Sequence, residues 1–262
     1  MSNEVMKKEA TEIAVQKSGF LALGDFDLAS AMAEEMDGLS VTFDRIKLPA
    51  GGMTVFEMPG DDPDNPETVK EFSAVILSQH PLRAYYKTQY TGGSNPPDCG
   101  SYDGVIGIPG ENSGCVGGNC KTCPYNKFGS DGKKGKACKE RRRLYLLKEG
   151  EIFPILFSLP TGSLQTFSKY IMKLLGKGYK SNSVVTRFTL KKATSSDGIA
   201  YSQAQFAIDR VLTKEEYALI DGLSNQVKMM QNTVAFEPDV EEAPENAPLV
   251  DPETGEIIEP LN

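Results

Sequence analysis

Residues 95–100 read NPPDCG, residues 114–124 read GCVGGNCKTCP, and residues 135–139 read GKACK. These pieces belong to a segment of about 88–140 that is rich in Gly, Pro, Asn, Lys and Cys and follows neither a helical nor a strand period. A structureless stretch of that length inside a domain is uncommon unless something holds it together. A bound metal would do so, because its ligands fix the loop from within.

The cysteines of the chain all lie in this segment, at positions 99, 115, 120, 123 and 138. Cys120-Lys-Thr-Cys123 has the spacing at which two thiolates grip one tetrahedral ion, and Cys138 follows at a zinc-ribbon distance. Cys99, in a rigid Pro-Pro turn, is the favoured fourth ligand. Cys115 and His80, the only histidine, are the alternatives. We therefore expect a zinc loop at about 95–140, with a closed structural zinc (Zn) site of Cys99, Cys120, Cys123 and Cys138.

Two other interpretations of the cysteines compete with the metal site. A redox C-x-x-C would sit between a strand and a helix, which the surrounding Gly-rich sequence does not suggest. Five core cysteines within 40 residues of polar loop are equally unexpected. The N-terminus has no apolar leader segment and no run reaches the roughly 20 apolar residues of a membrane helix. We therefore expect a cytoplasmic protein without membrane contact, in which thiols stay reduced.

Charge is divided unevenly along the chain. The last 26 residues, 237–262, hold nine acidic and no basic residues, whereas residues 1–236 have a net charge of +1 and residues 121–148 a net charge of +8. The acidic end contains five prolines and no aromatic residue, so we expect a disordered tail behind a nucleic-acid-binding domain of residues 1–236. Such a tail can be a solubilising segment, a competitor for the basic surface or a docking site for partner proteins.

Basic and aromatic residues alternate around the cysteines. Lys and Arg neutralise phosphates without reading sequence, and aromatic faces stack on unpaired bases. The candidate nucleic-acid-binding residues are Tyr85, Tyr86, Tyr125, Lys127, Phe128, Lys133, Lys134, Lys136, Lys139, Arg141, Arg142, Arg143, Tyr145, Arg187 and Lys191. The last two come from one polar strand face, a pattern that any solvent-facing hairpin shows. A solvated charge cluster with half-buried tyrosines is the competing interpretation.

The remaining sequence predicts an α+β, β-rich fold. We expect a helix over 25–37, strands near 41–43, 46–48 and 53–58, a loop over 61–67, and an apolar strand over 72–86 that breaks at Pro81. Hairpins are expected around Glu149-Gly150 and residues 196–198, and helices from Thr161 or Ser163 to Leu175 and from Thr213 to Gln231. This order suggests an OB-like small barrel with an inserted zinc loop and appended helices.

The cysteine segment also carries a resemblance. Asn95-Pro-Pro-Asp-Cys99, Cys120-x-x-Cys123-Pro124, Phe128-Gly129, Gly135-Lys136-x-Cys138-Lys139 and Arg142-Arg143-x-Tyr145 resemble a group of phage and mobile-element proteins over most of the chain. The β-rich body, zinc loop and acidic tail together are similar to the helix-destabilising proteins of large phages. Those are OB-fold single-stranded DNA-binding proteins whose zinc set includes a histidine. The first resemblance implies a phage or mobile-element origin, and the second implies single-strand binding in replication or recombination inside a bacterial host cell.

These observations favour non-sequence-specific binding of single-stranded nucleic acid, with DNA preferred. A protein-interaction module is the main alternative, either a phage inhibitor of a host complex or a zinc-ribbon transcription factor. An enzyme is expected least, because no phosphate-binding loop is present. Asp98, Asp103 and Glu111 could hold the magnesium of a nuclease, but acids in Gly-rich loops are usually turn formers.

Overall fold

The computed structural model describes residues 19–20, 28–36, 43–49, 51–60, 62, 65–88, 97–110, 113–195, 198, 200–230, 249–250 and 257–258. Its helices are α2 (Leu28–Glu35), α3 (Thr161–Gly176) and α4 (Lys214–Met230), with short 3₁₀ turns η2 (Pro124–Asn126) and η3 (Ser181–Ser183). Its strands are β1 (Arg45–Ile46), β2 (Phe56–Met58), β3 (Glu67–Val69), β4 (Glu71–Tyr85), β5 (Cys99–Ser101), β6 (Ile106–Pro109), β7 (Gly118–Asn119), β8 (Lys139–Leu147), β9 (Ile155–Leu159), β10 (Val184–Thr194), β11 (Ala200–Val211), β12 (Leu249–Val250) and β13 (Ile257–Ile258).

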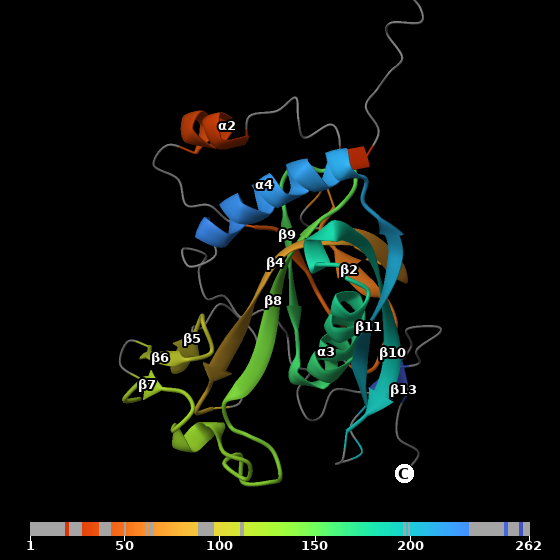
Figure 1. The fold of residues 1–262 in the computed structure, drawn as a ribbon. Coiled ribbons are helices and arrows are strands. Elements are labelled where there is room, and N and C mark those ends of the chain that lie inside the picture. Colours follow the sequence, from red (N-terminus) through yellow and green to blue (C-terminus); the bar gives the residue numbers. More distant parts are fainter. Residues whose placement is uncertain are drawn as a thin grey trace, which may run out of the picture.

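One long strand, β4, organises the main sheet. β8 pairs with one edge of it from Val75 to Ala84. Its other edge pairs with β10 over 71–75 and with β5 over 83–85, which extends the sheet in two directions. The order β1-β9-β8-β4-β5-β6-β7, with the β10–β11 hairpin attached to β4, makes nine strands in the described residues. In Figure 1 the far ends of β4 and β8 run away from the helices and carry β5, β6 and β7.

Two hydrophobic clusters cover opposite faces of this sheet. On one face α3 contributes Phe167, Tyr170 and Leu174 to a cluster that also contains a group of interlocked phenylalanines, Phe56, Phe72, Phe157, Phe188 and Phe206. On the other face α4 contributes Ile220, Leu223 and Val227 against the strands. The alternation of side chains along β4 and β8 supplies both faces, since neighbouring residues point to opposite sides.

Several elements agree with the expectation from sequence. The two hairpins are confirmed, with β8 pairing β9 and β10 pairing β11 in antiparallel register. The capping box is confirmed as well, because Thr213 N donates to Glu216 Oε2 at 2.9 Å and Glu216 N to Thr213 Oγ1 at 3.2 Å. At the start of α3, however, Pro160 is the N-cap residue and no side chain caps the helix. Ser163 is instead buried and accepts a hydrogen bond from Ala204 N at 2.9 Å.

Other elements differ from the expectation. Pro81 does not break β4, because it lies between the segments that pair with β10 and β5, where the second edge of β4 has no strand partner among the described residues. Glu67 belongs to strand β3, which pairs with β2, and not to a loop. The segment around the cysteines contains three short strands that its glycine-rich sequence concealed. The expected strand at 41–43 lies mostly outside the described residues.

The β-rich, mixed α+β class is correct, but the barrel is not observed. In the described part of the chain the sheet has free ends at β1 and β7, and β10–β11 branches from β4 without joining β1. Closure of an OB-like barrel would need that pairing, whereas here β2 and β3 form a separate two-stranded sheet. Of the acidic end, only the β12–β13 pair is described, and the predicted disorder of residues 237–262 lies otherwise outside the described residues. Among the described helices, none has the length and apolar character that crossing a membrane requires.

The Glu216 carboxylate generates a prediction about stability. The hydrogen bonds from Arg210, at 2.8 and 2.9 Å, lower the pKa of Glu216, and the bond from Thr213 N adds to this, against the opposing effect of burial. We expect Glu216→Gln to lower the free energy of unfolding by about 1–3 kcal/mol near neutral pH, because hydrogen bonds to a charged group are lost. Chemical denaturation measures the change.

The contribution of Glu216 to the free energy of unfolding depends on pH. Since the pKa of Glu216 is lowered on folding, its contribution is complete above the unfolded value of about 4.5 and is lost as the pH falls through the lower folded value. The difference between wild type and Glu216→Gln should therefore shrink in acid. Glu215→Gln, an exposed change in the same helical turn, is the control and should stay within about 0.5 kcal/mol of wild type. A constant difference down to strongly acidic pH would contradict the assignment.

Candidate metal centre and nucleic-acid interface

The segment 97–138 joins the far ends of β4 and β8, and we call it the cysteine module. Its residues 97–110 and 113–138 are described. It contains β5, β6, β7 and η2, and it belongs to neither hydrophobic cluster of the body. Cys120 and Cys138 are its most buried sulfur-bearing residues, at 6% and 8% exposure. The module therefore keeps a defined backbone without an apolar core of its own.

Two thiols of the module lie beside Gly107. A Cβ at this position would lie 3.0 Å from Cys99 Sγ and 3.6 Å from Cys120 Sγ, so these two sulfurs face the same point on β6. Burial raises the pKa of the Cys138 thiol to about 12. Arg83 opposes this rise, and the nearby thiols of Cys120, Cys123 and Cys99 add to it. Cys99, Cys120, Cys123 and Cys138 thus lie close enough to influence one another.

Cys115 and His80 were the alternative fourth ligands. Burial raises the pKa of Cys99, and the thiols of Cys115, Cys120 and Cys123 raise it further. His80 lies five residues before Tyr85, the β4 residue that pairs with Cys99, which is about 16 Å along a strand. Its Nδ1 donates to Tyr102 O at 2.8 Å, and no thiol is among the causes that lower its pKa, of which burial is the largest.

The side-chain atoms do not themselves form a finished metal site. No group of three or more His, Cys, Asp or Glu side chains in the described part of the chain is arranged to hold a metal ion. The cysteines are also free of disulfides. The module thus gathers thiols without joining them to one another.

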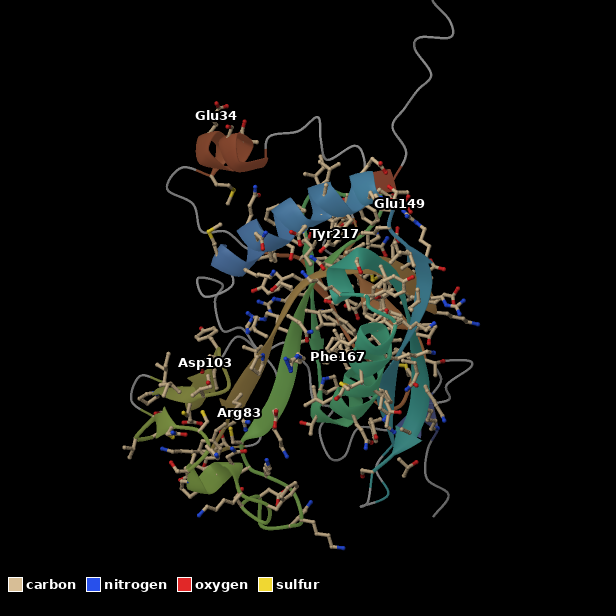
Figure 2. The ribbon with its side chains drawn as sticks, viewed as in Figure 1. Glu34, Arg83, Asp103, Glu149, Phe167 and Tyr217 are labelled. Atoms are coloured by element: carbon tan, nitrogen blue, oxygen red, sulfur yellow. The ribbon has the colours of Figure 1, made fainter. Side chains whose placement is uncertain are left out.

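Two polar residues fasten the module to the sheet. Arg83, on β4, donates from Nε to Gly104 O at 3.0 Å and from Nη1 to Asn126 Oδ1 at 2.7 Å, and its Nη2 lies 3.5 Å from Glu140 Oε2. Asn126 Nδ2 in turn donates to Cys120 O at 2.7 Å, while Lys136 Nζ donates to Asn126 Oδ1 at 3.1 Å. Figure 2 shows Arg83 where β4 reaches the module.

Sequence reasoning did not single out Arg83, Asn126 or Gly107. The only sequence signal for Arg83 was the one charge between Phe72 and Tyr86, and for Gly107 a lone glycine between two isoleucines.

The loop 127–137 is folded by its own hydrogen bonds and displays lysines. Asp131, the only acidic residue between Lys121 and Lys139, accepts from Lys133 N at 2.9 Å and Gly135 N at 3.1 Å. Ser130 Oγ donates to Tyr125 O and accepts from Ala137 N, both at 2.9 Å. Of the predicted cations, Lys127, Lys133, Lys134 and Lys139 are exposed, and Lys136 is half-buried.

The aromatic residues of the module differ in what they can contact. Phe128 is 80% exposed, and Lys136 Nζ lies 4.9 Å from the centre of its ring. Tyr85 and Tyr125 stack on each other with ring centres 4.0 Å apart, so each has at most one face left for another ring. Burial, together with a hydrogen bond to Tyr125, raises the pKa of Tyr85 to about 12. Tyr86 is half-buried. Phe128 is therefore the open aromatic surface.

Two predicted contact residues are in the interior. Arg143 and Tyr145 are fully buried at 0% exposure, so neither can reach nucleic acid from the surface. Both point to the α4 side of β8, where Arg143 lies between its register partners His80 and Ser158 on neighbouring strands. Arg141 and Arg142 are half-buried, and Arg142 Nε donates to Gln79 Oε1 at 2.5 Å. The basic run Arg141–Arg143 is thus largely part of the sheet.

The remaining predicted cations are separate from the module. Arg187 and Lys191 are exposed on β10. Arg187 pairs with Ser73, ten residues before Arg83 on β4, which is about 33 Å along the strand. The structure therefore does not join them to the lysines of the module in one continuous groove.

The acids considered for a nuclease form turns. Asp98 Oδ2 accepts from Lys87 N at 2.7 Å. Asp103 Oδ1 accepts from Val105 N and Ile106 N at 2.7 and 2.9 Å, which lowers the pKa of its carboxyl. Glu111 lies outside the described residues. Both described acids thus stabilise the backbone around β5 and β6.

Comparisons with protein-family models, with curated proteins and with solved structures found no match to this chain. The assignment of a function therefore depends on the geometry of the site.

The role of Asn126 generates a prediction about the module. Asn126→Ala removes the acceptor for Arg83 and Lys136 and the donor to Cys120 O. We expect hydrogen exchange to become at least about tenfold faster at the amides of Cys120 and Cys138, which bond to Val105 O and Tyr125 O, since about 1–3 kcal/mol of local stability is lost. Amides of β10 and β11 should be unchanged.

The matched control is Asn225→Ala, at an exposed position of α4. It should leave exchange in the module at the wild-type rate. Equal exchange at Cys120 and Cys138 in Asn126→Ala and wild type would show that Asn126 does not hold the module together.

Proposed function

We propose that this protein binds single-stranded nucleic acid, DNA in preference to RNA, through the lysine-bearing surface of the cysteine module. The observation that carries the proposal is Phe128, which is 80% exposed and lies beneath a lysine ammonium. The ring of Phe128 thus has an open π-face next to a cation, at a surface that is rich in lysine. An aromatic ring flanked by cations offers an unpaired base a stacking face and offers its phosphate a partner.

The charge around Phe128 supports the same function. Residues 121–139 contain six lysines and one acid, and that acid, Asp131, is engaged by backbone N–H groups of its own loop. Lysines on such a surface bind phosphates as point charges and release counterions, so binding weakens as salt rises. Lysines and an aromatic ring contact phosphates and base faces and do not read base edges, so the proposed binding is not sequence-specific.

Single strands fit this surface better than duplexes do. In the described part of the module the only helical element is η2, a 3₁₀ turn of three residues, so no recognition helix is available for a major groove. Stacking on Phe128 also requires a base that is already unpaired. The surface revises the earlier set of contact residues: it retains Tyr125, Lys127, Phe128, Lys133, Lys134, Lys136 and Lys139, and it omits Arg143 and Tyr145.

The cellular role follows from the resemblance to phage and mobile-element proteins. We place the protein in the cytoplasm of a bacterial host, where it would protect single strands during replication or recombination. The acidic tail would contact the other proteins of those processes, since nine negative charges and the apolar pair Ile257-Ile258 suit docking to basic partners.

A protein-interaction module remains the second candidate, and a specific surface favours it. Val105, Ile106, Ile108 and Val116 are 50–97% exposed on and beside β6. An exposed apolar patch of this kind is typical of protein contacts. Salt-sensitive binding to single strands would separate the two candidates, because association through these apolar side chains would persist at high salt.

Phe128 gives the first functional prediction. Phe128→Ala should weaken binding to a labelled single-stranded oligonucleotide by about 5- to 150-fold, the equivalent of roughly 1–3 kcal/mol of stacking. The salt dependence should stay the same, because no charge is removed. Fluorescence anisotropy at several salt concentrations measures both quantities.

Met172→Ala is the matched control, since Met172 is an apolar residue, 66% exposed, on α3. It should bind like wild type. Wild-type affinity in Phe128→Ala would place the binding surface elsewhere on the protein.

The tail gives the second functional prediction. The acidic residues of 237–262 and the lysines of the module are opposite in charge and joined by one chain, so the tail is present at a high effective concentration, in the millimolar range for short linkers. Deleting 237–262 should tighten single-strand binding at low salt, and the gain should fall as salt screens the competition. Anisotropy titrations of full-length and truncated protein test this. Coinciding curves at all salt concentrations would leave only solubility or partner docking for the tail.

A further inference from the structure

We propose that Cys99, Cys120, Cys123 and Cys138 hold one zinc ion, and that this ion serves as the missing core of the cysteine module. The site would be structural and not catalytic. It does not depend on the proposed function, because the ion would support the fold of the module whatever the module binds.

The described part of the cysteine module has no hydrophobic core of its own. The described part of the module adds no residue to either hydrophobic cluster, and its large apolar side chains point outward: Ile106, Ile108 and Phe128 are 50–80% exposed. Below about 40 residues, chains usually need disulfides, metals or association to fold. The module is close to that size, and its cysteines form no disulfide. A metal is the remaining internal means of support.

The four cysteines come from neighbouring elements of the module. Cys99 begins β5, which pairs with β6, and Cys120 follows β7, which pairs with the other edge of β6. Both sulfurs thereby approach Gly107 in the middle of β6. Cys123 precedes η2, and the amide of Cys138 donates to Tyr125 O within η2 at 2.9 Å. Backbone pairing and η2 thus place the segments that carry the four cysteines next to one another.

The sulfur atoms of the four cysteines decide which metal the site prefers. Four sulfurs are a soft, tetrahedral donor set that suits zinc. Zinc–sulfur bonds of about 2.3 Å place tetrahedral thiolates about 3.8 Å apart, so the side chains must rotate inward as the four S–H protons leave. The product carries two net negative charges, and Arg83, whose side chain is bonded within the module, offers a nearby positive charge.

Gly107 is the positioning residue of this site. Its φ is not in the left-handed region, so alanine is compatible with the backbone. An added methyl group would nevertheless stand 3.0 Å from Cys99 Sγ, 3.6 Å from Cys120 Sγ and 3.4 Å from Gly118 O. Gly107→Ala should therefore weaken zinc binding without removing a ligand. Gly176→Ala, on α3 with no atom near the added group, is the control.

The experiment measures metal by elemental analysis in full-length protein purified without chelator, together with zinc affinity by competition with a chromogenic chelator. We expect about one zinc per chain, loss of zinc in Cys123→Ser and Cys99→Ser, and full zinc in Cys115→Ser. Gly107→Ala should bind zinc at least about tenfold more weakly than Gly176→Ala. Cobalt substituted for zinc should show the thiolate charge-transfer absorption of a tetrahedral sulfur site.

The proposal would be overturned by full zinc in Cys123→Ser, by equal loss in Cys115→Ser and Cys99→Ser, or by iron in place of zinc. Cysteine variants could lose metal because the module unfolds, so hydrogen exchange provides a second measurement. Chelation of wild type should speed exchange in 97–138 and leave β10 and β11 protected, and no change on chelation also contradicts the proposal. These measurements contain no nucleic acid, so failure of single-strand binding leaves their outcome unaffected.

Discussion

The pairing of β4 with β8 is the interaction on which the rest of this structure depends. Near β10 both strands are buried between α3 and α4 and supply both hydrophobic clusters. Before Leu144, β8 is charged from Lys139 to Arg143, and beyond Ser78 β4 carries Gln79, His80 and Arg83 beside the buried Leu82 and Ala84. The two-stranded ribbon continues there past the helices (Figure 1). The cysteine module is attached at that end. It is therefore held by the sheet through backbone pairing and through Arg83, and it is cut off from the apolar core.

This separation explains why the module is the candidate functional region. A segment that shares no core with the body can present its side chains outward, and here it presents Phe128 and a group of lysines. The same separation requires internal support, which the Asn126 hydrogen bonds supply in part. The thiols of Cys99 and Cys120, which lie beside Gly107, are suited to supply the rest of this support by binding a shared metal ion.

The sequence was informative where local chemistry decides structure. Thr213 and Glu216 form the capping box that their spacing predicted, and both hairpins turn at their predicted glycine-containing positions. Strands β5 to β7 escaped prediction because strands of two to four glycine-rich residues have too few side chains to show a period. The barrel failed because its closure is a non-local pairing between sheet ends, which no single segment encodes.

The same reason separates the candidate nucleic-acid-binding residues that lie on the surface from those that lie in the interior. Lys127 to Lys136 lie in a loop, and the polar composition of that loop already indicates that it is exposed. Arg143 and Tyr145 belong to a strand, and the register of its pairing decides which of its faces is buried. A register shift between Ile76 and Ser78 of β4 helps determine which β8 residues face α4. That shift depends on the pairing of two strands that are more than 60 residues apart in the sequence. The sequence therefore suggested that the basic run is exposed, although the run continues into the interior.

The most direct test is an equilibrium titration of the full-length protein against matched single-stranded and duplex oligonucleotides at two salt concentrations. The account predicts tighter binding to the single strand, with an affinity that falls as salt rises by about 0.7 logarithmic units per logarithmic unit of salt for each phosphate contacted. Equal affinity for single strand and duplex, or binding that does not respond to salt, would contradict a lysine and aromatic surface for unpaired bases.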